Sequence, residues 1–420
     1  MKLNEVLKEL SFAPPKDKIS QIKSKLSSFL PVLKKELKGD VFLGGSFAKE
    51  TMVNKKVYDV DIFVRLAKNK FDTQVIERAA KKACAKFGYP ITTVHGSRDY
   101  FRVGVSDNAA FEIVPALKIS KPKEAENVID LSYFHVGYAR KKMFKNKNLA
   151  REIQIAKAFL MASNVYGAES YIRGFSGYAV ECLIIYYKTF ERFLRTVAES
   201  VGKIIIDPEK QYKKKEGILF MMNEGKTTGP LVLVDPTWKE RNVTAAVSQE
   251  AFDTLKKAAI SFLKHPNKSF FEEKMFDVDK FKQIAKKGEE YARISITTEK
   301  QDGDIAGTKL KKFASYLLVE LNKELDIIKN YFAYDNKKTA QLYLIALPKK
   351  EIVFRGPPVK MDKYAAKFRK EHKNAFVKAG KLFAKKKVSD SALTLVKKCI
   401  EKNRQKAKDM AIVEIEIKNN

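Results

Sequence analysis

The sequence predicts an α+β protein of several domains. Its 420 residues are enough for two to four domains with substantial cores. Apolar runs of strand length occur near the N-terminus and in the last third of the chain, whereas apolar residues at helical spacing dominate the middle. This order predicts helices around a small sheet, then a mainly helical central domain, and then an α/β C-terminal domain.

Breaks in these patterns indicate where the domains end. A basic, proline-containing stretch from Lys118 to Glu126 closes the first domain, which we predict to span residues 1–122. Helical spacing then continues through residues 123–264, until the break at His265-Pro266-Asn267. Residues 265–420 form the predicted C-terminal domain. Strands are expected there at 291–296, 342–347, 352–354 and 412–417, and a helix face at Leu310, Phe313, Leu317, Leu318 and Leu321.

The charge of the chain favours a polyanionic partner. Lys and Arg number 82 against 50 Asp and Glu, a formal net charge of +32, which suits nucleic acid or an anionic membrane surface. No apolar run approaches the roughly 18 residues of a membrane span, and the N-terminus does not resemble a signal peptide. Cys84, Cys182 and Cys399 lie far apart without metal spacing. We therefore expect a cytoplasmic protein with unpaired thiols and no membrane segment.

Much of this charge lies near the C-terminus. Between Val359 and Asp409, 17 Lys or Arg residues stand against 5 Asp or Glu residues. We expect one helix over Lys363–Lys387, with its aromatic residues directed inward and its lysines outward, toward phosphate. Those aromatic residues are Tyr364, Phe368, Phe376 and Phe383.

The segment from Gly44 to Val64 carries the strongest chemical signal. Asp59 and Asp61 alternate with apolar residues, so both carboxylates lie on one face of a predicted strand. Two carboxylates at i and i+2 on a buried strand repel each other unless a cation lies between them, and Mg²⁺ is a hard cation that takes oxygen ligands. Glu112, within the apolar run 111–115, is the candidate third carboxylate on a neighbouring strand.

The turn before this strand suits a phosphate group. Gly44 and Gly45 allow the backbone to approach a phosphate closely, and Ser46 offers a hydroxyl and an N–H group. Lys49 and Thr51 follow where they could line the same pocket. The Gly-Ser turn and Asp-x-Asp strand together resemble the signature of the DNA polymerase beta nucleotidyltransferase superfamily. The alternative is an ordinary turn with solvated aspartates.

Further segments resemble one family within that superfamily, the class I (archaeal-type) CCA-adding enzymes, which are tRNA nucleotidyltransferases. The matching segments follow the family's order along nearly the whole chain. They are Asp130–His135, Lys157–Leu160, Val165–Glu169, Arg173–Tyr178, Asp235-Pro236 with Arg241–Val243, and Arg355–Val359. The resemblance implies a polymerase-beta-like nucleotidyltransferase head, a helical domain that completes the nucleotide pocket, and a C-terminal region that binds tRNA.

The resemblance also implies a reaction. The enzyme would add C, C and A to the 3′ end of tRNA from CTP and ATP without a template, releasing pyrophosphate as the tRNA 3′-hydroxyl attacks the α-phosphate. Asp59, Asp61 and Glu112 would be the catalytic acids and would hold Mg²⁺. The implied nucleotide-binding residues are Gly45, Ser46, Lys49, Ser132, His135, Lys157, Tyr166 and Arg241. Of these, Arg241 would reach the incoming base.

Four positions depart from the family's pattern, among them Leu131 and Tyr133, which replace its Arg and its Pro. Glu112 stands where the family has Asp, and Lys49 stands where it has Arg. Two other readings of function therefore stay open: another RNA nucleotidyltransferase, poly(A)-adding or oligoadenylate-synthesising, or a non-enzymatic tRNA-binding homologue. His135 and Tyr166 could instead be core residues, and Arg241 with Asn242 could cap a helix that begins near Val243. A homodimer also stays open.

Overall fold

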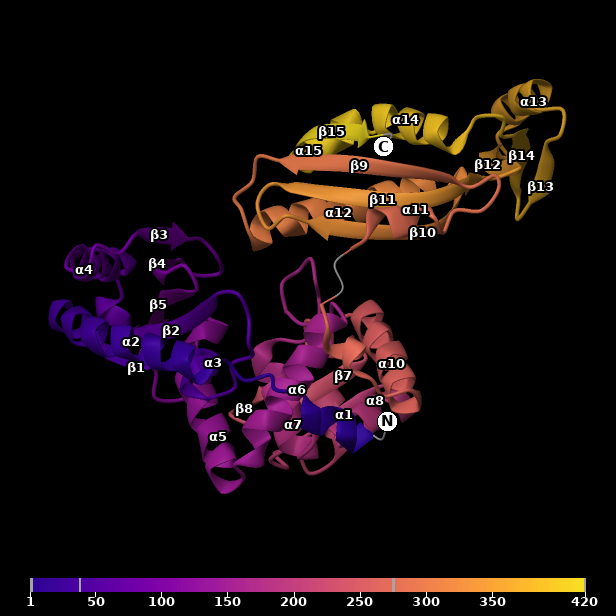
Figure 1. Ribbon diagram of the computed structural model, residues 1–420. Helices are drawn as coiled ribbons and strands as arrows, with labels where there is room; N and C mark the ends of the chain where they lie inside the picture. The colour runs from indigo at the N-terminus through magenta and orange to yellow at the C-terminus, as the bar shows by residue number, and fades with distance from the viewer. Residues whose placement is uncertain (1–2, 38, 274–275, 419–420) are drawn as a thin grey trace. The chain divides into compact units, whose positions relative to one another are not determined.

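The computed structural model describes residues 3–37, 39–273 and 276–418, with the backbone alone at 215 and 216 (Figure 1). Its fold is mixed α+β. The chain divides into two compact units, an N-terminal unit of residues 1–274 and a C-terminal unit of residues 275–420. The finer division at residues 122 and 264 stays a prediction.

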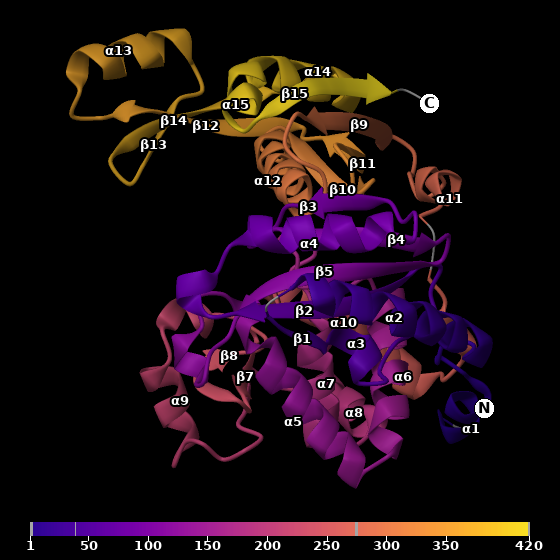
Figure 2. The ribbon, with the colours of Figure 1, turned by 90° about the vertical axis from the view of Figure 1, so that its left-hand side faces the viewer.

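The N-terminal unit begins with a five-stranded sheet in the order β1-β2-β5-β4-β3. β2 pairs with β5 in parallel, and the other neighbours are antiparallel. One face packs against α2 (Lys16–Glu36) and α4 (Thr73–Ala85), which cover it in Figure 2. The strands are β1 (Asp40–Leu43), β2 (Tyr58–Leu66), β3 (Ile91–Val94), β4 (Tyr100–Ser106) and β5 (Ala109–Leu117).

Alternation along these strands explains which face is covered. Val60 and Ile62 of β2 and Phe111 and Ile113 of β5 are fully buried against the helices. The residues between them, including Asp61 and Glu112, point to the opposite face because successive side chains alternate across a strand. The apolar face therefore anchors the sheet and leaves the acids on the free side.

The rest of the N-terminal unit is a helical core that includes Ile153, Ala156, Phe159 and Leu160. Ser176 caps α7 by accepting a hydrogen bond from the N–H of Ala179. The helices are α1 (Leu3–Glu9), α5 (Ser132–Lys145), α6 (Asn148–Ala162), α7 (Gly177–Tyr187), α8 (Phe190–Glu199) and α10 (Gln249–Lys264).

This core also contains a small sheet that the sequence patterns did not predict. β6 (Ile204–Ile206), β7 (Leu231–Asp235) and β8 (Trp238–Asn242) lie in that order, with α9 (Lys215–Met221) between β6 and β7 in the chain. The proposed helix cap at Arg241 and Asn242 is wrong, because both residues belong to β8 and the next α-helix begins at Gln249. Short apolar runs do not distinguish strands from helices by periodicity alone.

The C-terminal unit contains an antiparallel sheet in the order β10-β11-β9-β15, with α12 and α14 packed on one face. The strands predicted at 291–296, 342–347 and 412–417 are confirmed, and Leu310, Phe313, Leu317 and Leu321 are buried on α12 as expected. The elements are α11 (Val278–Lys282), β9 (Glu290–Thr298), α12 (Asp304–Leu321), β10 (Leu325–Tyr334), β11 (Thr339–Pro348), α14 (Ala392–Lys402), α15 (Arg404–Asp409) and β15 (Ile412–Lys418).

The single helix predicted over Lys363–Lys387 is wrong. Its first part is α13 (Asp362–Glu371), and the rest is a hairpin of β13 (Phe376–Lys378) and β14 (Lys381–Lys387). β14 also pairs with β12 (Glu351–Pro358), so that the predicted strand at 352–354 is confirmed. Ala379 and Gly380 both have positive φ, which suits a two-residue hairpin turn and ends a helix.

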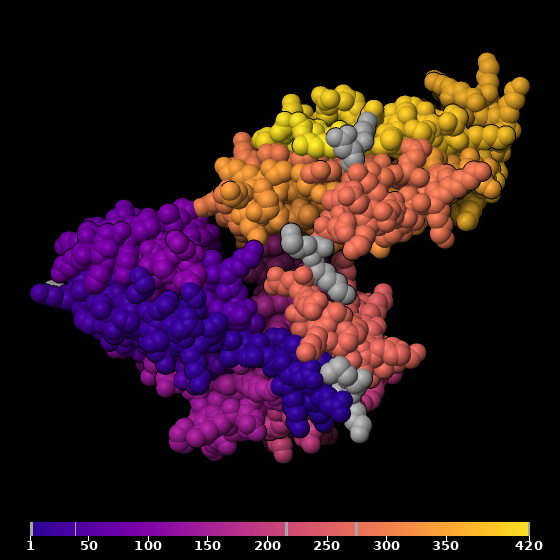
Figure 3. All heavy atoms as spheres, viewed as in Figure 1, coloured from indigo at the N-terminus to yellow at the C-terminus, as the bar shows by residue number. Residues whose placement is uncertain are grey.

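The expected burial of the aromatic residues in this segment also fails in part. The hairpin and α13 lie at one end of the C-terminal unit (Figure 1), where side chains project into solvent (Figure 3). Tyr364 on α13 is 61% exposed, and Phe376 is 36% exposed while it stacks on Phe383. Phe368 does pack inward, against Phe354 and Gly356. A small subdomain has too little interior to bury every aromatic ring.

Candidate active site

The predicted carboxylates lie side by side on the free face of the N-terminal sheet. In the parallel pairing of β2 with β5, Asp61 is opposite Glu112, and Asp59 lies two residues earlier on β2. On the other side of β5, Arg102 of β4 is opposite Glu112. The three acids are therefore neighbours, as the alternation of β2 and the apolar run around Glu112 predicted.

Cations already hold two of the three acids. Arg102 Nη2 lies 2.7 Å from Asp59 Oδ1, and Arg102 Nη1 donates to Glu112 Oε1 at 2.6 Å. Lys55 Nζ donates to Asp59 Oδ2 at 2.6 Å. Asp61 instead faces the glycine turn, where a Cβ built on Gly45 would lie 1.6 Å from Asp61 Oδ2. Gly45 must therefore stay without a side chain, and its φ of 58° also favours glycine.

The protonation of these acids reflects their burial and mutual repulsion. Burial raises the pKa of Asp61 to about 6, and Asp59 adds to the effect while Lys49 opposes it. Burial, followed by the charges of Asp61 and Asp59, raises the pKa of Glu112 to about 7, against the influence of Arg102. The local cations thus leave part of the negative charge uncompensated.

The donor set fits a hard divalent cation in its chemistry. Three carboxylates on adjacent strands offer oxygen ligands, which Mg²⁺ prefers, and a positive ion would relieve the repulsion that raises two of the pKa values. Within the described part of the chain, no three His, Cys, Asp or Glu side chains have their ligand atoms gathered for a metal ion. Asp59 and Glu112 both contact the Arg102 guanidinium.

The Gly-Ser turn continues into α3 (Gly45–Ala48), which leads to a buried charge cluster. Lys49 Nζ donates to Glu181 Oε2 at 2.5 Å, and Lys157 Nζ donates to Glu181 Oε1 at 2.9 Å. Thr51 Oγ1 also donates to Glu181 Oε1, at 2.8 Å. Lys49, Lys157 and Glu181 are 8%, 2% and 1% exposed. The buried contacts of Glu181 on α7 therefore connect the segment between β1 and β2 to the helical core.

The two lysines of this cluster differ in their free donors. Lys157 Nζ also donates to Thr51 O at 3.2 Å and Thr51 Oγ1 at 3.0 Å, so its three N–H groups are all used. Among the described residues, Lys49 Nζ has one hydrogen-bond acceptor, Glu181, and keeps two donors for another group. Lys49 is therefore better placed than Lys157 to contact a phosphate directly.

Tyr166 lies against the same cluster. A Cβ built on Gly177 would lie 2.9 Å from the Tyr166 hydroxyl and 3.9 Å from Lys157 Nζ, so the absence of a side chain at Gly177 lets these two groups come close. Burial, together with the charge of Glu181, raises the pKa of Tyr166 well above its usual range. Tyr166 therefore remains a neutral hydroxyl that can donate a hydrogen bond.

His135 and Arg241 meet at a second buried carboxylate, Asp235 of β7. His135 Nε2 lies 3.1 Å from Asp235 Oδ2, and Arg241 Nη1 donates to the same oxygen at 2.6 Å. The ring of Tyr178 stacks on His135 with the centroids 3.8 Å apart, and its hydroxyl donates to Asp235 Oδ1 at 3.3 Å. Ser132, the first residue of α5, lies one turn before His135 on the same helix.

Burial and the contacts of Asp235 set the protonation states in this second cluster. Burial opposes ionisation of Asp235, but the hydrogen bond and charge of His135, and then Arg241, lower its pKa below the usual range. Burial lowers the pKa of His135 despite Asp235. The Arg241 side chain is 21% exposed and keeps donors beyond the one on Asp235, so it can reach a ligand.

The sequence patterns gave no role to Glu181 or Arg102, and they did not show that Asp235 is the shared partner of His135 and Arg241. Glu181 is an acid within the apolar helix Gly177–Tyr187, and a buried acid is costly unless it is paired. That signal was available, although its lysine partners lie 24 and 132 residues away. Arg102 alternates with Phe101 and Val103 on β4, a pattern typical of a solvated strand face, so that nothing local pointed to the acids.

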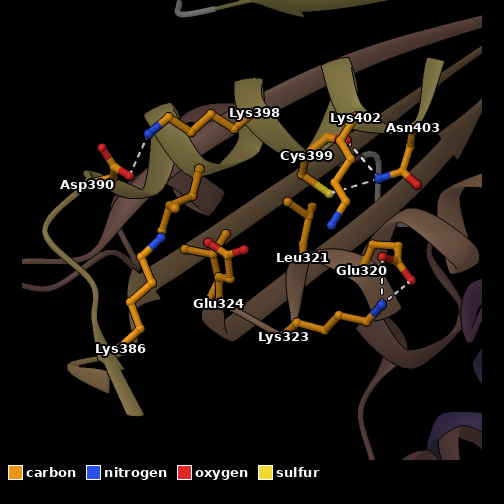
Figure 4. Close-up of a pocket in the computed structure, with 12 residues that line it drawn as sticks. Glu320, Leu321, Lys323, Glu324, Lys386, Asp390, Lys398, Cys399, Lys402 and Asn403 are labelled. Atoms are coloured by element: carbon orange, nitrogen blue, oxygen red, sulfur yellow. Dashed lines mark hydrogen bonds and ion pairs between the residues drawn. The ribbon is translucent and has the colours of Figure 1, made fainter. Parts of the chain in front are cut away.

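A separate cavity of about 190 Å³ lies within the C-terminal unit (Figure 4). Lysines and acids line it in pairs, as Lys323 contacts Glu320 and Lys398 contacts Asp390. None of the predicted site residues lines this cavity. Its mixed charge gives no preference for an anion or a cation.

The chain is similar in sequence to CCA-adding enzymes. A family model described as tRNA nucleotidyltransferase, second domain, matches residues 151–272. A CCA-adding enzyme of Nanoarchaeum equitans is 33% identical over 366 residues, which cover 86% of this chain and 88% of the relative. A CCA-adding enzyme of Saccharolobus solfataricus is 30% identical over 293 residues, or 69% and 66% of the two chains.

A solved structure of the Cid1 poly(U) polymerase bound to MgATP is similar in fold. It superposes with a TM-score of 0.50 at 13% identity, and the match covers 65% of this chain and 98% of that one. At this identity the likeness concerns the fold alone. In the part of the chain that the structure describes, no helix has the length and apolar character needed to cross a membrane.

Proposed function

Because the chain belongs to the family of CCA-adding enzymes, we propose that it adds C, C and A to the 3′ end of tRNA, using CTP and ATP. The observation that carries the proposal is the placement of Asp61 opposite Glu112, with Asp59 beside them and the Gly45 turn against Asp61. Acids next to a phosphate-binding turn are what nucleotidyl transfer requires.

The acids would hold Mg²⁺ and the incoming nucleotide would lie beside them. Bound through Asp59, Asp61 and Glu112, Mg²⁺ would neutralise phosphate charge and lower the pKa of the tRNA 3′-hydroxyl. The hydroxyl oxygen then attacks the α-phosphorus, the bond to the bridging oxygen breaks, and pyrophosphate leaves. Glu112, which lies opposite Asp61 on the neighbouring strand, would also be placed to accept the hydroxyl proton.

Side chains around the turn would position the triphosphate. We assign direct contacts to the backbone of Gly45, to Ser46, and to the two free donors of Lys49. Tyr166 would add its hydroxyl. Lys157 has no free N–H group in this arrangement, so we assign it the support of Thr51 and Glu181 rather than a phosphate contact.

The second cluster would read the base. Asp235 holds Arg241 and His135 at one carboxylate, and Ser132 lies one turn from His135. We propose that the remaining donors of Arg241 bind hydrogen-bond acceptors on the edge of the incoming C or A. U and G do not present the same pattern of acceptors. We place the enzyme in the cytoplasm, where its cysteines stay reduced.

Replacing Arg241 by Lys keeps the charge on Asp235 but removes the guanidinium fork. We expect kcat/KM for CTP and ATP to fall about 10- to 100-fold, as for the loss of a charged hydrogen bond, with increased use of UTP. Steady-state extension with each nucleotide singly measures both effects. Equal kcat/KM values for wild type and Arg241→Lys would show that the Arg241 guanidinium does not recognise the base.

The tRNA would be held through its backbone by the basic residues of the C-terminal unit. A-form RNA hides its major groove from side chains, so that shape and phosphates are contacted. Neutralising 6 to 10 phosphates predicts a loss of affinity of roughly 10³-fold or more between 50 and 200 mM salt. Filter binding of the whole protein to tRNA over this range tests the expectation. A flat salt profile would contradict backbone binding.

An extension assay tests the proposed function. The substrates are tRNAs that end at the discriminator base, at C, or at CC, each with single nucleotides and with CTP plus ATP. We expect C to be added to the first two and A to the third. Growth with ATP alone on every end would indicate a poly(A)-adding or oligoadenylate-synthesising enzyme. Tight tRNA binding without extension would indicate a non-enzymatic homologue.

A further inference from the structure

Arg102 occupies the space between two of the catalytic acids. One nitrogen of its guanidinium lies 2.7 Å from Asp59 Oδ1, and the other donates to Glu112 Oε1 at 2.6 Å. The β4–β5 register places Arg102 directly opposite Glu112, so the contact follows from the sheet rather than from a loop. The planar fork of arginine matches two carboxylate oxygens better than an ammonium does.

These contacts use the oxygens that a metal ion would need. Asp59 Oδ1 and Glu112 Oε1 meet Arg102, and Asp59 Oδ2 meets Lys55 Nζ at 2.6 Å. Asp61 alone among the three acids is directed at the glycine turn. A divalent cation that takes the same oxygens must displace the guanidinium, since two positive groups cannot share them without strong repulsion.

The Arg102 side chain is able to leave. It is 37% exposed, so that water can solvate the guanidinium after it is released. Lys55 is 46% exposed and holds Asp59 from its other side as an i,i+4 pair. Lys55 therefore contacts the same carboxylate without bridging to Glu112, which makes it a matched comparison.

We propose that Arg102 is a resident counter-ion that keeps free divalent cations out of the catalytic acids until a nucleotide brings its metal ion with it. This inference rests on the proposed function. In the nucleotide-free enzyme, Arg102 pairs with Asp59 and Glu112 and opposes loading of the metal alone. A triphosphate adds negative charge beside the acids, which favours the metal and gives the displaced guanidinium an anionic partner. Metal and nucleotide binding are thereby coupled.

The test measures binding of Mn²⁺, alone and with a nucleotide, to the whole protein by electron paramagnetic resonance of the free ion. Arg102→Met removes the bridging charge and keeps an unbranched side chain, and Lys55→Met is the matched control. Without nucleotide, we expect Arg102→Met to bind Mn²⁺ at least about tenfold more tightly than wild type. We expect Lys55→Met to change the affinity less than about threefold, because Lys55 contacts Asp59 alone and does not bridge to Glu112.

The same titrations also measure the coupling between metal binding and nucleotide binding. A non-hydrolysable CTP analogue should raise the Mn²⁺ affinity of wild type much more than that of Arg102→Met. Equal Mn²⁺ affinities of wild type and Arg102→Met without nucleotide, or weaker binding by the variant, would overturn the proposal. Should Arg102→Met fail to fold, Arg102→Lys takes its place, because it retains the charge without the fork and should bind Mn²⁺ with intermediate affinity.

The outcomes separate this inference from the proposed function. Tighter Mn²⁺ binding by Arg102→Met with no tRNA extension by wild type would support the counter-ion and reject the reaction. Complete C, C and A addition by wild type with unchanged Mn²⁺ affinity in the variant would support the reaction and reject the counter-ion.

Discussion

Replacing Asp61 by Asn is expected to remove nucleotide addition while tRNA binding stays intact. The substitution keeps the size of the side chain and its contact with the Gly45 turn, but removes the charge that lies beside Glu112. Loss of one member of a catalytic unit lowers kcat by roughly 10⁴-fold or more. We therefore expect the rate of extension to fall by at least that factor, measured in single-turnover assays with saturating CTP.

The control for Asp61→Asn is Asp40→Asn on the neighbouring strand β1. Asp40 pairs with Arg65 away from the other acids and is 37% exposed, so its replacement should leave the rate within about threefold. Both variants should bind tRNA as wild type does, because the proposed contacts to the RNA backbone lie in the C-terminal unit. An Asp61→Asn protein that extends tRNA at a tenth of the wild-type rate would remove Asp61 from the catalytic acids.

Replacing Glu181 by Ala is expected to destabilise the N-terminal unit strongly. Glu181 is the shared partner of Lys49 and Lys157, and all three are nearly inaccessible to solvent. Removing one member of a buried ionic network leaves uncompensated charge, at a cost of about 3–5 kcal/mol in the free energy of unfolding. Urea unfolding followed by tryptophan fluorescence at Trp238 reports on this unit, and Glu191→Ala is the control.

Glu191 forms an exposed i,i+4 pair with Arg195 on α8, the helix that follows α7. Its replacement should change the free energy of unfolding by less than about 1 kcal/mol. A Glu181→Ala protein that is as stable as Glu191→Ala would show that the buried cluster does not hold the unit together. The Lys49 side chain would also lose its anchor, so KM for nucleotides should rise in Glu181→Gln even where that protein stays folded.

The contribution of Glu181 should depend on pH in a defined direction. Burial alone would raise its pKa, but Lys157 and Lys49 lower it from the ordinary 4.5 to about 2. The unfolded chain therefore takes up a proton first as pH falls, so the stabilisation present above pH 4.5 is lost progressively toward pH 2. The stability difference between wild type and Glu181→Gln should shrink over this window in urea titrations. A constant difference would contradict the ion-pair account.

Local patterns predicted the acids well because their signal lies in adjacent residues. Alternation alone places Asp59 and Asp61 on one face, and the structure confirms that Glu112 neighbours them on β5. The β-strands of the C-terminal sheet followed from short apolar runs of strand length. These features depend on the period of a single segment and not on its distant contacts.

The remaining features depend on contacts between distant segments or on turn geometry. Glu181 meets Lys49 from 132 residues away, and Arg102 reaches Asp59 only through the strand order of the sheet. The hairpin after α13 is set by two residues with positive φ, of which Ala379 gives no local sign. Periodicity cannot detect such pairings, and a lysine-rich segment with spaced aromatic residues is compatible with either a helix or a hairpin.

The most direct test of the central claim is to supply wild-type protein with all four nucleotides and a tRNA that ends at its discriminator base, and then to sequence the added 3′ nucleotides. We expect C, C and A, in that order, with no further growth after A. Runs of A or U, or growth without a fixed end, would contradict it.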